Sequence, residues 1–229
     1  MDTEALAVLL QFTDGLFPAG GYAHSFGLET YVQEGTVRDR DGVLAFLRAH
    51  LEGSAGPGDA VAVVLALDLS RADDLAGLVA LDARLDAMRP AAELREASRQ
   101  MGRQTLRVAA SLTEAPLLRR LHDEAEAGRT SGHHPVVFGA VGGAAGWTHM
   151  AAALGYLHAA AAVVVGAALR LLPLGQLEGQ RLLATVRPLM VRLAEGAASA
   201  TADDLWGFTP GIDAASMRHA QLEARLFRS

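Results

Sequence analysis

The run AAALGYLHAAAAVVVGAAL, residues 151–169, decides the fold because it is long enough to cross a membrane. It closes a stretch from Thr130 to Leu169 that contains no Asp, Glu, Lys or Arg. Alanine and glycine contribute little to membrane insertion, His158 lies in mid-run, and no cluster of Lys or Arg follows. We therefore interpret the run as the buried central helix of a helical protein, in which small residues let neighbouring helices approach closely, and not as a membrane span.

Apolar residues recur at helical spacing elsewhere in the chain. Clear examples are Leu44, Leu47 and Leu51, then Leu78, Leu81, Leu85 and Met88. Strand patterns are nearly absent, and aromatic residues make up only 5% of the chain. We predict an all-α fold: a single irregular helical bundle domain of roughly eight to ten helices over residues 1–210, followed by an amphipathic segment over residues 211–229.

Glycine and proline predict where these helices end. The expected stops are Gly35, the GSAGPG run at residues 53–58, Pro90, Pro116, the stretch 128–135, Pro173 and the stretch 207–211. Pro188 lies inside the helical pattern of residues 173–195, so we expect a kink or a break there. Connections as short as these join packed helices and not separate domains.

The composition excludes several classes of protein. With 229 residues and 51% hydrophobic content, the chain can bury a large core. Its formal net charge of -6 argues against a general nucleic-acid binder, which needs clustered Lys and Arg. The absence of cysteine removes disulfides, thiolate metal ligands and cysteine nucleophiles, and Asp2 and Glu4 lie where a secretion signal would carry positive charge. We expect a cytoplasmic protein that binds neither nucleic acid nor membrane.

The stretch LFPAGGYAHSFGLE, residues 16–29, sets backbone-bending residues against groups that could do chemistry. His24 and Ser25 are neighbours whose side chains diverge by about 100° on a helix, and no G-x-S-x-G motif occurs, so we do not expect a catalytic pair. Neither phosphate-loop motif is present. We predict a conformational role, in which Gly20 and Gly21 allow positive φ or close packing and His24 or Ser25 satisfies backbone groups at a helix start.

Eight histidines make metal binding the main functional alternative. No H-E-x-x-H motif and no pair of histidines at i and i+4 occurs, and His133 and His134 point apart unless the loop before Pro135 brings them together. His149 and His158 fit core positions better than ligand positions. We predict no metal site, no cofactor and no catalytic residue. A His-dependent metal-binding protein and a generic all-α interaction domain remain the alternatives.

The final stretch, SMRHAQLEARLFRS, residues 216–229, has an apolar face flanked by arginines. A solvated face with a frayed end would explain it, and so would a partner-binding helix. We expect the segment to be free in the isolated protein and to become ordered on a partner, with Leu222, Leu226 and Phe227 buried there and Arg218 or Arg225 at the rim. On this interpretation, truncation after Pro210 leaves the helical fold nearly unchanged.

Four blocks of the chain carry a resemblance to a known family. They are LFPAGGYAHSFGLETYVQEGTV, HPVVFGAVGG, PLGQLEGQ and SMRHAQLEARLFRS, and in this order and spacing they resemble the urease accessory protein UreF family over essentially the whole chain. The resemblance implies an all-α, dimerising protein that is not an enzyme. It further implies that the protein bridges UreD, also called UreH, and the GTPase UreG to apo-urease, so that nickel is inserted with GTP hydrolysis.

The resemblance also assigns residues. The signature positions are Pro18, Gly20, Gly21, His24, Ser25, Gly27, Leu28, Glu29, His134, Pro135, Phe138, Gly139, Pro173, Gly175, Gln176 and Gln180. The expected partner-binding positions are Arg218, His219, Leu222, Arg225, Leu226, Phe227 and Arg228, with Arg225 as the first choice for a key residue. The chain departs from the family at Ala220, where an acid is usual, which puts any salt bridge of that acid in doubt.

Overall fold

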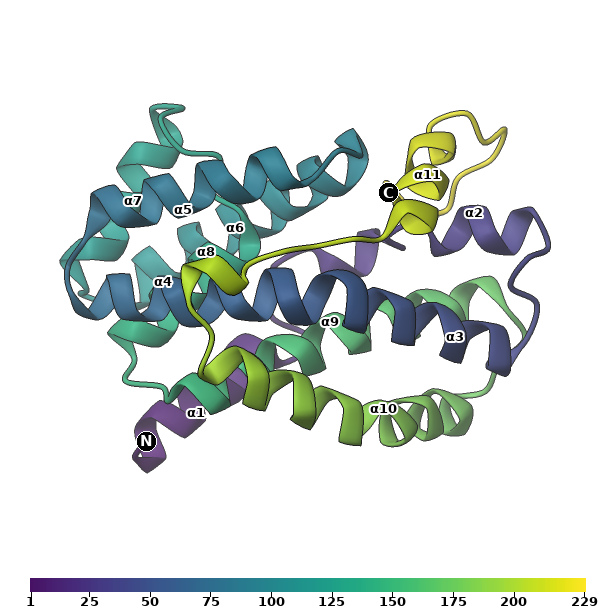
Figure 1. The fold of residues 1–229 in the computed structure, drawn as a ribbon, viewed down its shortest axis with the longest axis horizontal. Helices are drawn as coiled ribbons and strands as arrows, with labels where there is room; N and C mark the ends of the chain where they lie inside the picture. The colour runs from purple at the N-terminus through teal and green to yellow at the C-terminus, as the bar shows by residue number, and fades with distance from the viewer.

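A computed structural model describes all residues from 1 to 229 as eleven α-helices without a strand (Figure 1). The helices are α1 (Thr3–Thr13), α2 (Leu28–Gln33), α3 (Arg40–His50), α4 (Val61–Arg71), α5 (Leu75–Met88), α6 (Ala92–Leu112), α7 (Pro116–Glu126), α8 (His134–Ala144), α9 (His149–Leu171), α10 (Gln176–Ala198) and α11 (Pro210–His219). Three other helical segments are η1 (Gly21–Ala23), η2 (Leu51–Ala60) and η3 (Ala202–Asp204). The prediction of an all-α fold is confirmed.

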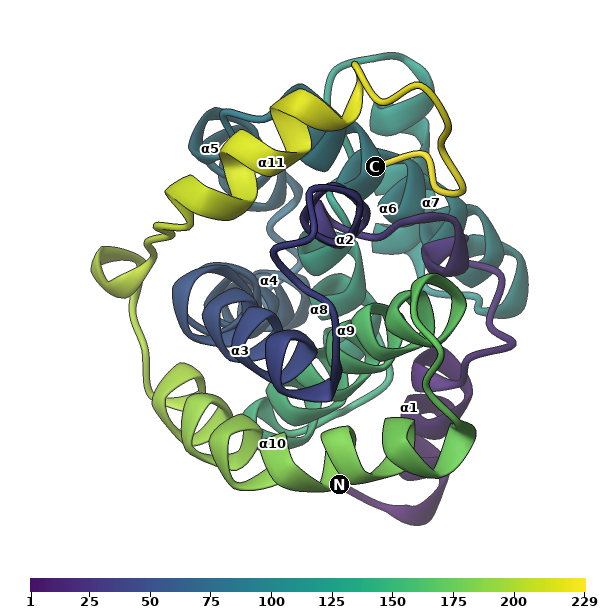
Figure 2. The same cartoon turned by 90° about the vertical axis from the view of Figure 1, so that its right-hand side faces the viewer.

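Helix α9 lies inside the bundle, with α1 and α10 packed against it on the outside (Figure 2). It is the one helix long and apolar enough to cross a membrane, and half of its most apolar stretch is buried in the protein. Small residues along α9 allow close packing: a Cβ on Gly155 would lie 2.9 Å from Leu9 Cδ1 of α1. The abundance of small residues in this helix therefore serves helix packing.

The GSAGPG run, residues 53–58, does not end a helix, so this expected stop is wrong. The run lies in η2, a wide π-helical segment that joins α3 to α4 and contains Pro57. The backbone N–H groups of Phe208 and Trp206 donate to the carbonyls of Gly53 (2.7 Å) and Pro57 (3.3 Å). A Cβ on Gly53 would lie 2.8 Å from the carbonyl oxygen of Phe208. The glycines thus let an extended segment, residues 205–209, pack against the helix.

The prolines behave in two ways. Pro116 and Pro135 lie in the first turns of α7 and α8, and α5 ends two residues before Pro90, as the sequence predicts. Pro188, in contrast, lies within α10, which continues without a break from Gln176 to Ala198. The helix tolerates this proline because α10 packs against α9, and burial of Leu182, Val186 and Leu189 outweighs one missing backbone hydrogen bond.

Candidate functional site

The N-terminal block and the C-terminal end of the chain, the two most distinctive parts of the sequence, meet in space beside α2 (Figure 2). The backbone N–H groups of Ser25 and Phe26 donate to the carbonyl oxygen of Ser229, at 2.5 and 3.1 Å. The Ser25 hydroxyl donates to the same oxygen at 2.8 Å, and His24 Nδ1 lies 2.8 Å from the Ser229 hydroxyl. The block that could have held a catalytic pair therefore holds the last residue of the chain.

Glu29 is the centre of this contact. Its side chain is 2% exposed, and its carboxylate accepts hydrogen bonds from the backbone N–H groups of Leu226 (2.7 Å) and Phe227 (3.0 Å) and from His219 Nε2 (2.9 Å). Burial by itself would raise the pKa of Glu29, but the hydrogen bonds from Leu226, His219 and Phe227 outweigh burial and lower it. Glu29 is therefore a buried, charged acceptor that fixes the backbone of residues 220–229, which we call the tail.

His219, at the end of α11, completes the network. The side chain is fully buried, and its other nitrogen, Nδ1, lies 2.8 Å from Glu93 Oε2 on α6. The imidazole therefore lies between two carboxyl groups, Glu29 on one side and Glu93 on the other. Arg225 Nη1 adds an ion pair to Glu93 at 3.3 Å. We call Ser25, Glu29, Glu93 and His219 the tail cradle.

The tail is thus packed on its own domain, which contradicts the expectation of a segment that stays free until a partner binds. Phe227 is 4% exposed, and the guanidinium carbon of Arg170 lies 4.3 Å from the centre of the Phe227 ring. Truncation after Pro210 would remove His219 and Phe227 and uncover Glu29, so we now expect it to destabilise the fold and not to leave it unchanged. Leu226, in contrast, is 54% exposed, and Arg225 and Arg228 lie at the surface.

The sequence predicts positive φ or close packing for Gly20 and Gly21, and each of the two glycines has one of these roles. Gly20 has φ +85°, a left-handed conformation that favours glycine. Gly21 does not, but a Cβ there would lie 3.0 Å from Val163 Cγ2 of α9, so its role is close packing. Burial, followed by the charge of Arg228, lowers the pKa of His24 to about 4, so the imidazole is neutral near pH 7. Gly20 and Gly21 shape the turn that delivers His24 to the tail.

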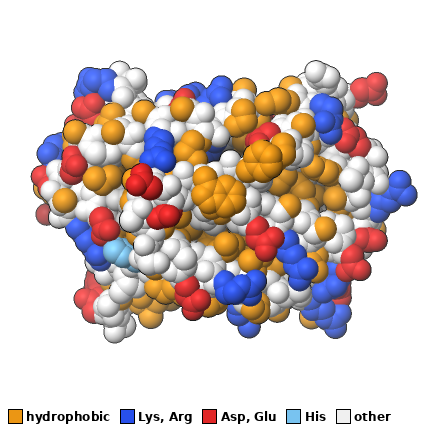
Figure 3. All heavy atoms as spheres, in the orientation of Figure 1, with side chains coloured by type: hydrophobic (Ala, Val, Ile, Leu, Met, Phe, Trp, Pro, Cys, Tyr) orange, Lys and Arg blue, Asp and Glu red, His pale blue; other side chains and the backbone are white.

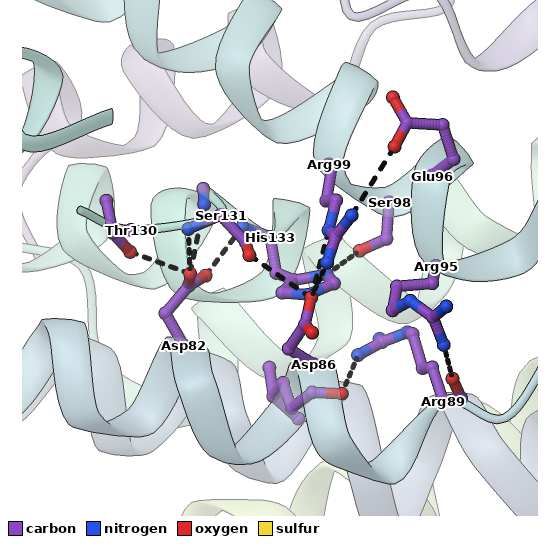
Figure 4. Close-up of polar contacts among 12 residues, drawn as sticks. Asp82, Asp86, Arg89, Arg95, Glu96, Ser98, Arg99, Thr130, Ser131 and His133 are labelled. Carbon is purple, nitrogen blue, oxygen red and sulfur yellow. Dashed lines mark hydrogen bonds and ion pairs between the residues drawn. The ribbon is translucent and has the colours of Figure 1, made fainter. Parts of the chain in front are cut away.

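A second buried carboxylate, Asp82 of α5, holds the start of α8 (Figure 4). It accepts hydrogen bonds from the Thr130 hydroxyl (2.7 Å) and from the backbone N–H groups of Ser131 (2.7 Å), Gly132 (3.0 Å) and His133 (2.6 Å). These donors precede the helix that begins at His134, where a negative charge is favourable. Sequence analysis missed Asp82, because nothing along the chain links it to a loop far downstream.

Asp86, one helical turn after Asp82, binds the His133 side chain (Figure 4). His133 Nε2 lies 2.9 Å from Asp86 Oδ1, Arg99 Nε donates to the same oxygen at 2.9 Å, and the Ser131 hydroxyl does so at 3.1 Å. Burial by itself would raise the pKa of Asp86, but the hydrogen bonds from His133, Arg99 and Ser131 outweigh burial and lower the pKa to about 2. Burial, then the charge of Arg89, lowers the pKa of His133, which is therefore a neutral donor.

We predict that Asp86→Asn removes an acid-sensitive part of the stability. A carboxylate whose pKa falls from 3.8 to about 2 on folding contributes stability above pH 4, and this contribution is lost as the pH falls through 2. Urea unfolding should show Asp86→Asn to be about 2 kcal/mol less stable than the wild type at pH 7, with the gap closing toward pH 2. Asp123→Asn, an exposed control on α7, should show no such gap. A constant difference across this pH range would contradict the assignment.

The signature positions of the two later blocks, from His134 onward, are not brought to the cradle. Phe138 is buried against Trp147 and Tyr156, and Pro135 lies in the first turn of α8. Gly175, Gln176 and Gln180 are exposed at the start of α10 and make no hydrogen bond to the cradle. No group of three or more His, Asp and Glu side chains is placed to hold a metal ion, so the metal-binding alternative gains no support.

The fold and the cradle define an all-α protein whose most distinctive residues hold its own C-terminal segment. The family model for UreF matches residues 37–187. The urease accessory protein UreF of Trichodesmium erythraeum (strain IMS101) is 35% identical over 225 residues, which cover 98% of this chain and 97% of that protein. The UreF protein of Bacillus sp. (strain TB-90) is 31% identical over 98% of this chain and 99% of its own length. That of Geobacillus kaustophilus (strain HTA426) is 31% identical over 100% of both chains. The chain therefore belongs to the UreF family of urease accessory proteins.

Proposed function

We propose that this protein bridges UreD, also called UreH, and the GTPase UreG to apo-urease during GTP-dependent nickel insertion. The protein acts as a cytoplasmic homodimer and has no catalytic role of its own. Neither phosphate-loop motif occurs in the chain, so GTP is bound and hydrolysed by UreG. Family membership supports the role in urease maturation, and the tail cradle supports a specific binding surface.

The observation that carries the proposal is the way the cradle presents the tail. Glu29, His219 and Phe227 anchor the segment, while Leu226 (54% exposed) and Met217 (50% exposed) leave apolar surface in water. Arg225 and Arg228 are exposed next to Leu226. Apolar residues flanked by arginines, on a backbone that is already ordered, resemble the energetic centre of many protein interfaces. A segment ordered in advance also binds at a lower entropic cost than a free tail would.

We predict that Arg225→Ala weakens the complex with UreD about tenfold without unfolding the domain. Its side chain is exposed and only loosely paired with Glu93, so the loss should appear mainly in binding. The matched control is Arg192→Ala, an exposed arginine of α10 whose hydrogen bond is to Pro188 in its own helix. Binding to purified UreD and UreG would be measured by calorimetry, and urease activation by reconstitution with nickel and GTP.

Two results would overturn this assignment in different ways. If the wild-type protein formed no complex with UreD or UreG and did not promote urease activation, the bridging function itself would be wrong. If Arg225→Ala bound UreD as tightly as the wild type and Arg192→Ala did, bridging would stand but the tail would not be its binding surface.

A further inference from the structure

A cavity of about 450 Å³ lies between the helical core and the segment that leads into α11. Residues of α3, η2, α5, α6, α8 and α9 form its inner wall, and residues 207–217 form its outer wall. Pockets of about 300 to 1,000 Å³ are typical of small-molecule sites. The cavity lies apart from the cradle, which the tail itself fills.

The inner wall of the cavity carries polar groups, two of which have no hydrogen-bond partner within the protein. Asp59 forms an ion pair with Arg89 and accepts a hydrogen bond from the Tyr156 hydroxyl at 3.1 Å. The imidazoles of His50 and His134 line the same wall, and neither ring makes a hydrogen bond within the protein. His50 is only 9% exposed. A buried imidazole without a partner has unused hydrogen-bonding capacity directed at whatever fills the cavity.

The charges around the cavity do not balance. Arg89 is neutralised by Asp59, whereas Asp213, on the outer wall, makes no ion pair and has only the Thr209 hydroxyl at 3.4 Å. The histidines do not supply the missing positive charge, because burial lowers the pKa of His50 and lowers that of His134 to about 4. Burial raises the pKa of Asp213, while the Thr209 hydrogen bond and the charge of Arg89 lower it. The lining therefore carries two carboxylates, Asp59 and Asp213, against the one guanidinium of Arg89.

The remaining lining suits an apolar body that carries a positive charge. Phe26, Tyr156 and Phe208 contribute aromatic rings, and Met88, Met101 and Met217 contribute thioethers. Aromatic faces attract cations, and methionine adapts to irregular shapes. Phe208 is 74% exposed and Met217 is 50% exposed, so the cavity reaches the surface near them. Hydrophobic side chains gather on the face that residues 205–209 cross (Figures 1 and 3).

We propose that this cavity binds a monovalent organic cation: an amine or amidine carried on a small aromatic or aliphatic body, with its charge next to Asp213 and its donors within reach of His50 and His134. A metal ion does not fit the same description, since no three His, Asp or Glu side chains are placed to coordinate one. The cavity shares Met217 with the surface proposed to bind UreD, but the inference is tested separately from the bridging function, because its test measures binding of a small molecule and not of UreD.

Benzamidine and benzamide test the proposal, since they have nearly the same shape and differ in charge. Benzamidine should bind the full-length protein saturably in calorimetry and raise its unfolding temperature, and benzamide should bind at least about tenfold more weakly. Asp213→Asn should reduce this preference. Equal binding of both compounds, or no saturable binding of benzamidine up to 10 mM, about the range expected for a small fragment, would overturn the proposal.

A pair of substitutions on one helix locates the bound molecule. Ala160 and Ala162 are both half-buried on α9, but only Ala160 lines this cavity, whereas Ala162 lines an adjoining hollow beside residues 12–22 that shares Met101, His134 and Val163 with it. Ala160→Leu should fill the cavity and abolish benzamidine binding, whereas Ala162→Leu should leave it unchanged. Loss of binding in Ala162→Leu alone, or unchanged binding in Ala160→Leu, would place the compound elsewhere and overturn the assignment.

Discussion

Replacing Glu29 with alanine should destabilise the domain by about 3 to 5 kcal/mol, the range seen when one partner of a buried charge network is removed. The substitution leaves the backbone N–H groups of Leu226 and Phe227 without an acceptor. It also leaves His219 next to Glu93 alone, in a place where the imidazole is fully buried. Each unsatisfied donor in such a site adds its own desolvation cost.

Urea unfolding would measure this loss, and limited proteolysis would locate it. Cleavage should appear first within residues 220–229, because these residues depend on the cradle. The matched control is Glu34→Ala, since Glu34 follows α2 and pairs with Arg218 of α11 at 2.7 Å, but in an exposed position. Its loss should change stability little, because exposed ion pairs contribute little. Equal effects of the two substitutions would show that the cradle does not hold the tail.

Structural features that depend on residues close together in the chain could be predicted from the sequence. Features that depend on contacts between residues far apart in the chain could not. Helix ends at Pro116 and Pro135 are local properties of the backbone, so they could be predicted. The burial of α9 could also be predicted, because its small residues argue for helix packing over membrane insertion. The GSAGPG run misleads because its glycines serve residues 205–209, which lie far along the chain.

The candidate site was harder to predict for the same reason. The resemblance to the UreF family identified Glu29 as a signature residue and His219 as an expected partner-binding residue, but it did not indicate that they bind one another. They are 190 positions apart, and helical periodicity contains no information about such a pair. The exposed charges of the tail suggested a free segment. The tail is instead anchored by backbone N–H groups that donate to Glu29, and a sequence pattern does not indicate which backbone groups form such bonds. Asp82 was missed because its four hydrogen bonds come from a loop about 50 residues away.

A single methyl group should have the second large effect, at Gly139 of α8. In most helices glycine is less favourable than alanine by about 1 kcal/mol, so Gly→Ala in a helix is normally stabilising. At Gly139, however, a Cβ would lie 2.2 Å from the carbonyl oxygen of Val63 and 2.8 Å from the Cβ of Ala66, both on α4. The nearer atom belongs to the backbone of a buried helix and cannot move by a change of rotamer. Gly139→Ala should therefore push α8 away from α4 and cost about 3 kcal/mol or more.

Gly166→Ala on α9 is the control that separates close packing from helix propensity. Both glycines lie within helices, but a Cβ on Gly166 would meet no atom within 4 Å. Gly166→Ala should raise the free energy of unfolding by about 0.5 to 1 kcal/mol, while Gly139→Ala lowers it. Chemical unfolding of both variants at one pH would measure the opposite signs. If both substitutions stabilised the protein, α4 and α8 would not be in close contact at Gly139, because a close contact there leaves no room for an added methyl group.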